Sequence, residues 1–131
     1  MIFIDSNIPM YIVGAPHPNK DAARSALERV IHRGERMVTS AEVMQEILHR
    51  YASIQRLDAI QPAFDALLGV VDEVFPVEAE DVKGARDVMM GLAKLSARDA
   101  LHVSVMKRRG LKRVMSFDAG FDAVEWIERV S

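Results

Sequence analysis

Two carboxylates stand directly after short apolar segments of the sequence. Catalytic and ligand-binding side chains often occupy such positions, at the ends of buried strands. Asp5 follows the apolar run at residues 2–4, and Asp118 lies two residues beyond Ser116, after a second such segment. Carboxylates that converge can bind a hard divalent cation, because oxygen ligands suit Mg²⁺ and Mn²⁺ better than zinc. Each residue alone also has a structural alternative, since Asp commonly forms turns and caps helices at such positions.

Two further acids, Glu46 and Asp99, lie in segments with helical periodicity. Glu46 stands beside an apolar stripe and could instead pair with Arg50 four residues later, at a gain of about a few tenths of a kcal/mol. Asp99 follows Ser96 at capping-box spacing, so its carboxylate could serve only the helix N-terminus. The helix after Ser96 is apolar on most sides, however. Its first turn should therefore lie near a sheet, where a merely solvated carboxylate is less expected.

The segments that must position these acids alternate between strand and helix patterns. Apolar runs predict strands at residues 2–4, 37–39, 74–75 and 114–117, with a last, edge strand near 126–130. Apolar pairs spaced by about four residues predict helices over residues 21–34, 41–51, 62–71, 80–94 and 100–109. This alternation favours an α/β fold, a three-layer sandwich in which helices cover both faces of a central, mostly parallel, twisted sheet of about five strands.

The same periodicity predicts which helix faces are buried. In the second helix the expected stripe is Val43/Met44, Ile47/Leu48 and Tyr51, and Ser40 should cap the helix. The third should bury Phe64, Leu67, Leu68 and Val71, with Pro62 in its first turn. The fourth should bury Val82, Ala85, Met89 and Leu92/Ala93.

Length and composition fit one domain spanning residues 1–131. A chain of 131 residues with 50% hydrophobic and 27% charged residues can bury a sizeable core without a metal or disulfide. The absence of Cys excludes disulfide frameworks, thiolate zinc sites and cysteine nucleophiles, and it fits a reducing cytoplasm. The uncharged stretch from Ser6 to Asn19 contains three prolines and a glycine, so no membrane association is expected.

The formal net charge of −2 conceals an uneven distribution. Residues 57–82 contain seven acids and no Lys or Arg, so the rest of the chain carries 17 basic against 12 acidic residues. Five of the basic residues fall between Lys107 and Arg113. This asymmetry permits a nucleic-acid partner, although solvated charged surfaces would give the same pattern.

Four short motifs occur in a characteristic order along the chain. They are Asp5-Ser6-Asn7, Thr39-Ser40 followed by Glu46, Ala97-Arg98-Asp99-Ala100-Leu101-His102, and Ser116-Phe117-Asp118. The ordered set resembles the PIN-domain ribonucleases, in particular the VapC toxins of bacterial and archaeal toxin–antitoxin pairs, over essentially the whole chain. Each motif is short and common, and the specificity of the resemblance lies in their order and spacing.

The resemblance implies which acids bind metal. Asp5, Glu46, Asp99 and Asp118 would be the acidic ligands, and Asn7 and Ser116 would play supporting polar roles. Two alternatives stay open at this point. Asp122 could share or replace part of the fourth role, and Glu42 is a rival to Glu46, which we prefer because it precedes Ile47-Leu48 as the family pattern does.

A metal is also expected on electrostatic grounds. Four ionised carboxylates about 6 Å apart would repel by roughly 3 kcal/mol per pair at an effective dielectric constant near 20, or roughly 17 kcal/mol in all. Such a cluster must either take up protons or bind cations, and oxygen ligands favour Mg²⁺ or Mn²⁺. We expect His49 and His102, one turn from Glu46 and Asp99, to be core or supporting residues rather than ligands.

The implied activity is metal-dependent endoribonuclease action. One metal would lower the pKa of a bound water, and a second, if present, would stabilise the leaving 3′ oxygen. The family resemblance implies 5′-phosphate and 3′-hydroxyl products from tRNA or other translation-related RNA. It also implies a VapB-type antitoxin as partner and a homodimer.

Basic side chains outside the acidic centre are candidates for phosphate contacts, although each could equally be a solubilising residue. They are Lys20, Arg24, Arg98, Lys107, Arg108, Arg109, Lys112 and Arg113. Only 6% of the residues are aromatic, so extensive base stacking is not expected.

Two other functions compete with this interpretation. A non-catalytic PIN scaffold could bind RNA or protein through the same groove, although the presence of all four acids argues against it. A phosphoryl-transfer receiver domain also gathers acids at strand ends. Such a domain would need an acidic pair after the first strand and a Lys after a late one, and Asp5-Ser6-Asn7 and Ser116-Phe117-Asp118 supply neither.

Overall fold

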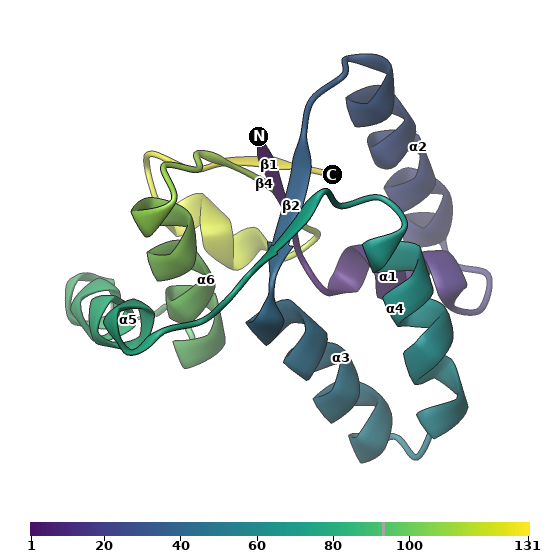
Figure 1. Ribbon diagram of the computed structural model, residues 1–131, viewed down its shortest axis with the longest axis horizontal. Coiled ribbons are helices and arrows are strands. Elements are labelled where there is room, and N and C mark those ends of the chain that lie inside the picture. The colour runs from purple at the N-terminus through teal and green to yellow at the C-terminus, as the bar shows by residue number, and fades with distance from the viewer. Residues whose placement is uncertain (93) are drawn as a thin grey trace.

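A five-stranded parallel sheet forms the centre of the molecule, as a computed structural model describing residues 1–92 and 94–131 shows (Figure 1). The strands are β1 (Ile2–Ile4), β2 (Met37–Ser40), β3 (Glu73–Phe75), β4 (Arg113–Met115) and β5 (Glu128–Val130). Their order in space is β3-β2-β1-β4-β5, and every neighbouring pair is parallel. In the central strand, Phe3 is in register with Val38 on one side and Val114 on the other.

Helices cover both faces of this sheet. They are α1 (Asn7–Val13), α2 (Pro18–His32), α3 (Ala41–Ser53), α4 (Ile60–Leu68), α5 (Ala79–Gly91) and α6 (Ala97–Arg108), with short 3₁₀ helices η1 (Leu57–Ala59) and η2 (Ala119–Ala123). Figure 1 shows α5 and α6 on one side of the sheet and α1, α2 and α4 on the other. The predicted three-layer α/β architecture is therefore confirmed.

The sequence of β1 explains its central position. Ile2, Phe3 and Ile4 are each fully buried, as a strand covered by helices on both faces requires. Full burial of such a side chain stabilises the fold by about 1.5–3 kcal/mol. The uninterrupted apolar run thus selects the middle of the sheet for β1, and it places Asp5 at the carboxyl end of the central strand.

The strand order creates a crevice beside β1. The chain moves from β1 outward through β2 and β3, and then crosses to β4 on the opposite side of β1. Parallel α/β sheets bind ligands beyond the carboxyl ends of their strands, at the point where the strand order reverses. Here that point lies between β1 and β4, where the chain continues into Asp5 and Ser116.

The two helix starts predicted from Ser residues are confirmed. The Ser40 hydroxyl accepts a hydrogen bond from the Val43 amide at the start of α3, and the Ser96 hydroxyl accepts one from the Asp99 amide at the start of α6. Pro62 lies in the first turn of α4, where its missing N–H costs no helical hydrogen bond. Local sequence chemistry thus sets where these helices begin.

Several predicted boundaries and faces were wrong. Helix α1 was not predicted, and it occupies part of the uncharged stretch after β1. Leu48 and Leu68, expected inside, are 44% and 43% exposed. The last strand is an edge strand as expected, but it begins at Glu128, and Trp126 lies before it.

The buried face of α5 is also displaced from the predicted one. Ala85 is buried as predicted, but Val82 and Met89 are 56% and 39% exposed, and Asp81 is buried in their place. Gly84 faces α6 so closely that an added Cβ would collide with the Ser104 hydroxyl. Because the inward face contains a charged residue and a glycine, apolar periodicity could not locate it; Ala93, also assigned to that face, lies outside the described residues.

No helix among residues 1–92 and 94–131 combines the length and apolar character needed to cross a membrane.

Candidate metal-binding and catalytic site

Asp5 lies at the centre of a hydrogen-bonded cluster at the carboxyl ends of β1 and β4. Its Oδ1 accepts from the Ser6 amide at 2.8 Å, and its Oδ2 accepts from the Ser116 hydroxyl at 2.6 Å. The Asn7 amide nitrogen lies 3.1 Å from the Ser116 hydroxyl oxygen and 3.4 Å from Asp5 Oδ2. Burial raises the pKa of the Asp5 carboxyl, although His102 and Ser116 act in the opposite direction.

Glu46 reaches the same cluster from the middle of α3. Its Oε2 accepts a hydrogen bond from the Ser6 hydroxyl at 2.8 Å, and its Oε1 is hydrogen-bonded to Nε2 of His102 on α6. Burial alone would raise the pKa of Glu46, but the hydrogen bond and charge of His102 outweigh burial and lower the pKa. Glu46 therefore pairs with Ser6 and His102, not with Arg50 on the helix surface.

His102 is fully buried behind the carboxylates, as expected of a residue in the core. Its Nε2 lies 3.8 Å from Asp5 Oδ1, and its Nδ1 has no hydrogen-bond partner among the described residues. Burial lowers the pKa of His102, but Glu46 and Asp5 raise it above the ordinary value overall. An imidazolium held between two carboxylates fits this balance.

Asp99 and Asp118 approach each other on the opposite wall of the cluster. A Cβ added to Gly120 would lie 3.0 Å from Asp118 Oδ1 and 3.1 Å from Asp99 Oδ2, so the absence of a side chain at Gly120 leaves room for both carboxylates. Burial and the neighbouring Asp118 charge raise the pKa of Asp99 to about 7. Asp118 Oδ1 also accepts from the Gly120 amide at the start of η2, so its structural role exists beside any chemical one.

The four predicted acids line one open pocket of about 440 Å³. The lining residues are Asp5, Ser6, Asn7, Glu46, Ser96, Ala97, Arg98, Asp99 and Asp118. We call this the carboxylate pocket. One donor atom from each of Asp5, Glu46 and His102 lies within 4.8 Å of the others, which is compact enough to hold a metal ion.

The two rival acids lie apart from this pocket. Both oxygens of Asp122 are bound by the Arg129 guanidinium, at 2.9 and 3.0 Å, and Asp122 does not line the pocket. Glu42 is one turn before Glu46 and is likewise absent from the lining. His49, expected to be a core or supporting residue, is exposed, because it lies on the outer face of α3.

Sequence reasoning missed Ser6 as a contributor to the site. Its hydroxyl joins Glu46 to the end of β1, over 40 residues of sequence. The Asp5-Ser6-Asn7 motif contained the signal, but a serine after a strand is also an ordinary turn residue. Thr39, another motif residue, donates from its hydroxyl to the Ile4 carbonyl at 2.9 Å and so fixes β2 against the end of β1.

The structure separates the predicted phosphate-contact residues into three groups. Arg98 lines the carboxylate pocket, but the stretch from Lys107 to Arg113 lies at the far end of α6 and at the start of β4, away from the acids. Most of its arginines are already paired, with Arg108 2.7 Å from Asp81 and Arg113 2.9 Å from Glu35. The expected phosphate contacts of this stretch are therefore not supported by its position.

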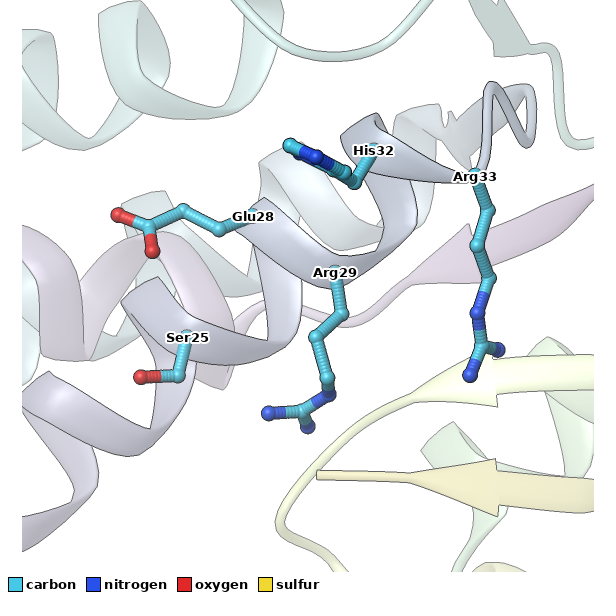
Figure 2. Close-up of a pocket in the computed structure, with 5 residues that line it drawn as sticks. All are labelled: Ser25, Glu28, Arg29, His32 and Arg33. Carbon is cyan, nitrogen blue, oxygen red and sulfur yellow. The ribbon is translucent and has the colours of Figure 1, made fainter.

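Lys20 and Arg24 lie on α2, outside the carboxylate pocket. The Lys20 ammonium group donates to the Gly14 carbonyl at 2.9 Å, and Arg24 is exposed. A separate hollow of about 490 Å³ lies farther along α2 (Figure 2). Figure 2 shows Arg29 and Arg33 extending from α2 toward the C-terminal strands, and this hollow shares no lining residue with the carboxylate pocket.

Comparison with known proteins agrees with the fold and with the ordered motifs. The model of the PIN domain family matches residues 2–127. Ribonuclease VapC13 of Mycobacterium tuberculosis is 57% identical over 131 residues, which is 100% of both chains.

Two solved structures share the architecture at low sequence identity. The Mycobacterium tuberculosis toxin VapC20, described as cleaving the sarcin–ricin loop, superimposes with a TM-score of 0.79 at 21% identity over 100% of both chains. VapBC2 from Rickettsia felis, solved on a DNA fragment from its promoter, gives a TM-score of 0.74 at 15% identity over 100% of both chains. Together with the family match and the full-length relative, the comparison shows that this chain belongs to the PIN-domain family, as a VapC-type endoribonuclease toxin.

Proposed function

We propose that the carboxylate pocket binds Mg²⁺ or Mn²⁺ through Asp5, Glu46, Asp99 and Asp118 and hydrolyses RNA phosphodiesters there. The observation that carries the proposal is the convergence of four carboxylates from separate parts of the chain on one open pocket. Among the residues that the structure describes, Arg98 is the one cationic side chain that lines the pocket beside them. Excess negative charge of this kind is suited to a divalent cation.

The donor set fits a hard cation. The pKa of Asp99, raised to about 7 by burial and by Asp118, indicates that without a bound cation the cluster would relieve its repulsion by retaining a proton near neutral pH. A divalent cation would displace that proton and neutralise the cluster more completely. Carboxylate oxygens favour Mg²⁺ or Mn²⁺. His102 holds Glu46 from behind and leaves the pocket itself lined by oxygen donors.

When bound, such a cation supplies a hydroxide nucleophile near neutral pH and neutralises charge on the phosphodiester. The chain's own contribution is to hold the ligands rigidly. Ser116 and Asn7 orient Asp5, while Ser6 and His102 orient Glu46. Arg98, on the rim, would contact a phosphate of the substrate.

The partners follow from the relatives. RNA is the substrate that the name of the 57% identical relative indicates, and tRNA or another translation-related RNA is the class we propose. The Rickettsia felis structure holds a VapBC pair, which supports a VapB-type antitoxin as a partner of this chain. We further propose a homodimer and a cytoplasmic location, and we expect residues 1–131 to fold as one domain.

The decisive experiment combines metal binding with cleavage. Purified protein should bind Mn²⁺ saturably in calorimetry and should cleave total RNA only with Mg²⁺ or Mn²⁺. Asp5→Asn should abolish cleavage and weaken Mn²⁺ binding while the circular dichroism spectrum stays unchanged. Glu42→Gln is the matched control on α3 and should leave both properties intact. Cleavage that survives in Asp5→Asn, or a wild-type chain without saturable Mn²⁺ binding, would contradict the proposal and favour the scaffold.

A further inference from the structure

A second pocket, of about 430 Å³, adjoins the carboxylate pocket on the side of α1. It is lined by Asn7, Met10, Tyr11, Gly14, Ala15, Pro16, His17, Arg50, Tyr51, Ile54 and Arg56. Asn7 lines both pockets, so the two hollows meet at the side chain that lies beside Asp5 and Ser116. We call this second hollow the α1 pocket.

An aromatic cluster lies at the α1 pocket. The rings of Tyr11 and His17 have centroids 5.0 Å apart, and the ring of Phe117 meets Tyr11 edge to face at 5.3 Å. Phe117 stands between Ser116 and Asp118 in the sequence, and its backbone amide donates to Asn7 Oδ1 at 3.2 Å. The cluster is therefore fixed directly to the groups that surround the scissile position.

The charge of the α1 pocket is opposite to that of its neighbour. Its ionisable lining residues include Arg50 and Arg56 but no Asp or Glu, whereas four carboxylates line the adjoining pocket. The Arg56 guanidinium is held by both oxygens of Asp58, at 3.0 and 3.1 Å. Within the described residues no ion pair is formed by Arg50, so its guanidinium is the cation available to a ligand.

The two pockets together match the needs of a polynucleotide. An RNA chain with one phosphate at the carboxylates must pass its next nucleotide over an adjoining surface that does not repel it. Proteins that bind single-stranded nucleic acid combine aromatic rings, on which bases stack, with basic groups along the backbone. The α1 pocket, which Asn7 also lines, offers both.

We propose that the α1 pocket is a nucleotide subsite. It takes the unpaired base next to the scissile phosphate onto the Tyr11–His17 rings, and Arg50 binds that nucleotide's phosphate. This inference rests on the proposed ribonuclease function and deepens it, because it names a single-stranded segment as the substrate around the cut. Both tyrosines of the chain, Tyr11 and Tyr51, line this pocket.

The test uses six single-stranded RNA hexamers, each with 2-aminopurine at a different position, titrated with full-length protein in Ca²⁺. Stacking quenches 2-aminopurine fluorescence. We expect saturable quenching at one or two adjacent positions with the wild-type chain and with Tyr11→Phe, which retains the ring. Tyr11→Leu should lose the quenching and bind about 5- to 100-fold more weakly. Thermal melting checks that this variant folds.

Arg50 supplies a second, independent variant, because its side chain is exposed and not part of the core. Arg50→Gln should weaken hexamer binding and reduce the dependence of log Kd on log salt by about 0.7 to 1, as expected for the loss of one phosphate contact. Arg86→Gln, an exposed arginine on α5 outside both pockets, is the matched control and should change neither quantity.

The failure of the subsite and the failure of the ribonuclease proposal give different results. If Tyr11→Leu and Arg50→Gln both bind the hexamers as the wild type does, and no position is quenched, the subsite is wrong even though the wild type cleaves RNA. If the wild type neither binds the hexamers nor cleaves total RNA with Mn²⁺, the ribonuclease proposal itself fails, and the subsite with it.

Discussion

Two aspartates hold the same position in adjacent helices but experience opposite environments. Asp81 is the third residue of α5 and Asp99 is the third residue of α6, and these helices pack together. The Asp81 carboxylate accepts from the Glu78 amide at 2.8 Å and from Arg108 at 2.7 Å. Asp99 instead faces Asp118 across Gly120.

Their pKa values show what the difference means. Burial opposes the charge of Asp81, but the Glu78 amide and Arg108 overcome it and lower the pKa of Asp81. Burial and Asp118 act together to raise the pKa of Asp99 to about 7. A carboxylate whose charge is satisfied within the protein stabilises the fold, and one whose charge is left unsatisfied is available for a ligand. The same helix position therefore has a structural use in α5, and in α6 it carries a residue that we propose as a metal ligand.

The largest expected effect comes from exchanging the carboxylate of Asp99 for an amide. Asp99→Asn should reduce metal-dependent RNA cleavage by about 10³-fold, because loss of a metal ligand removes several kcal/mol of transition-state stabilisation. The metal-free protein should be at least as stable as the wild type, since the repulsion of Asp118 is removed. Cleavage rates and urea unfolding measure the two effects. If the variant loses both activity and stability, Asp99 has a structural role like that of Asp81, and the contrast between the two residues is wrong.

The converse substitution should affect stability alone. Asp81→Asn should lower the free energy of unfolding by about 2 kcal/mol, because it removes a buried charge that binds Arg108 and a backbone amide. Cleavage per folded molecule should stay within about twofold, since Asp81 does not line the carboxylate pocket. Urea unfolding, with kcat measured well below the transition, tests this. Unchanged stability would show that the pair with Arg108 contributes nothing.

The two aspartates should also contribute with opposite signs to the pH dependence of the free energy of unfolding. Without metal, Asp99 in the native protein keeps its proton up to its raised pKa of about 7, whereas in the unfolded chain it loses the proton above its ordinary pKa of 3.8. The free energy of unfolding should therefore fall as the pH rises from about 4 to about 7. Asp5 and His102, whose pKa values are also raised, act in the same direction, with His102 acting above 6.5. We expect a loss of ~1–2 kcal/mol, reduced by solvent screening because Asp99 is partly exposed.

The contribution of Asp81 has the opposite sign. Because the pKa of Asp81 is lowered in the native protein, its contribution to stability is fully present above pH 3.8 and is lost as the pH falls through the native pKa. Urea unfolding of metal-free wild type, Asp99→Asn and Asp81→Asn across pH 3 to 8 separates the two. Asp99→Asn should flatten the fall between 4 and 7, and saturating Mn²⁺ should reverse that fall. A flat wild-type profile in that range would contradict the environment assigned to Asp99.

The smallest expected effect is on the KM for RNA, and it is measured by replacing one cationic side chain near each end of α6. Arg98→Gln should raise the KM for RNA by about 3- to 10-fold and leave kcat nearly unchanged, because Arg98 lies on the pocket rim. Lys112→Gln, just beyond the far end of the helix, should change KM by less than about twofold. Steady-state kinetics at two salt concentrations provides the measurement. Equal effects of the two variants on KM would indicate that the basic stretch 107–113 also contacts RNA.

The sequence predicted the convergence of the four acids better than it predicted the helix faces, and the reason is physical. The acids lie in short segments whose order along the chain is itself informative, and Asp5 directly follows the fully buried apolar run of the central strand. The inward face of α5 depends instead on Gly84, which leaves room for Ser104 of α6, and on Asp81, whose buried carboxylate binds Arg108. Such tertiary partners leave no trace in periodicity.

The basic residues illustrate a second limit. Composition indicated excess positive charge outside residues 57–82, but it could not show that acids from distant segments pair with much of that charge. Arg113 contacts Glu35 and Glu128, and Arg108 contacts Asp81. The aromatic cluster of the α1 pocket was equally invisible, since Tyr11 and Phe117 are separated by most of the chain. Proximity in three dimensions, not the count of residues, decides both surfaces.

The contacts of the Ser116 hydroxyl mean that the surroundings of Asp5 are completed late in the synthesis of the chain. This hydroxyl donates to Asp5, 111 residues earlier in the sequence, and bonds to Asn7 and to the Asp118 amide. Chains are synthesised from the N-terminus at about 5–20 residues per second, so Asp5 leaves the ribosome several seconds before the partners that complete its surroundings. A chain that stops before β4 carries Asp5, Glu46 and Asp99 but lacks Ser116 and Asp118. Incomplete translation products of this nuclease are therefore expected to be harmless.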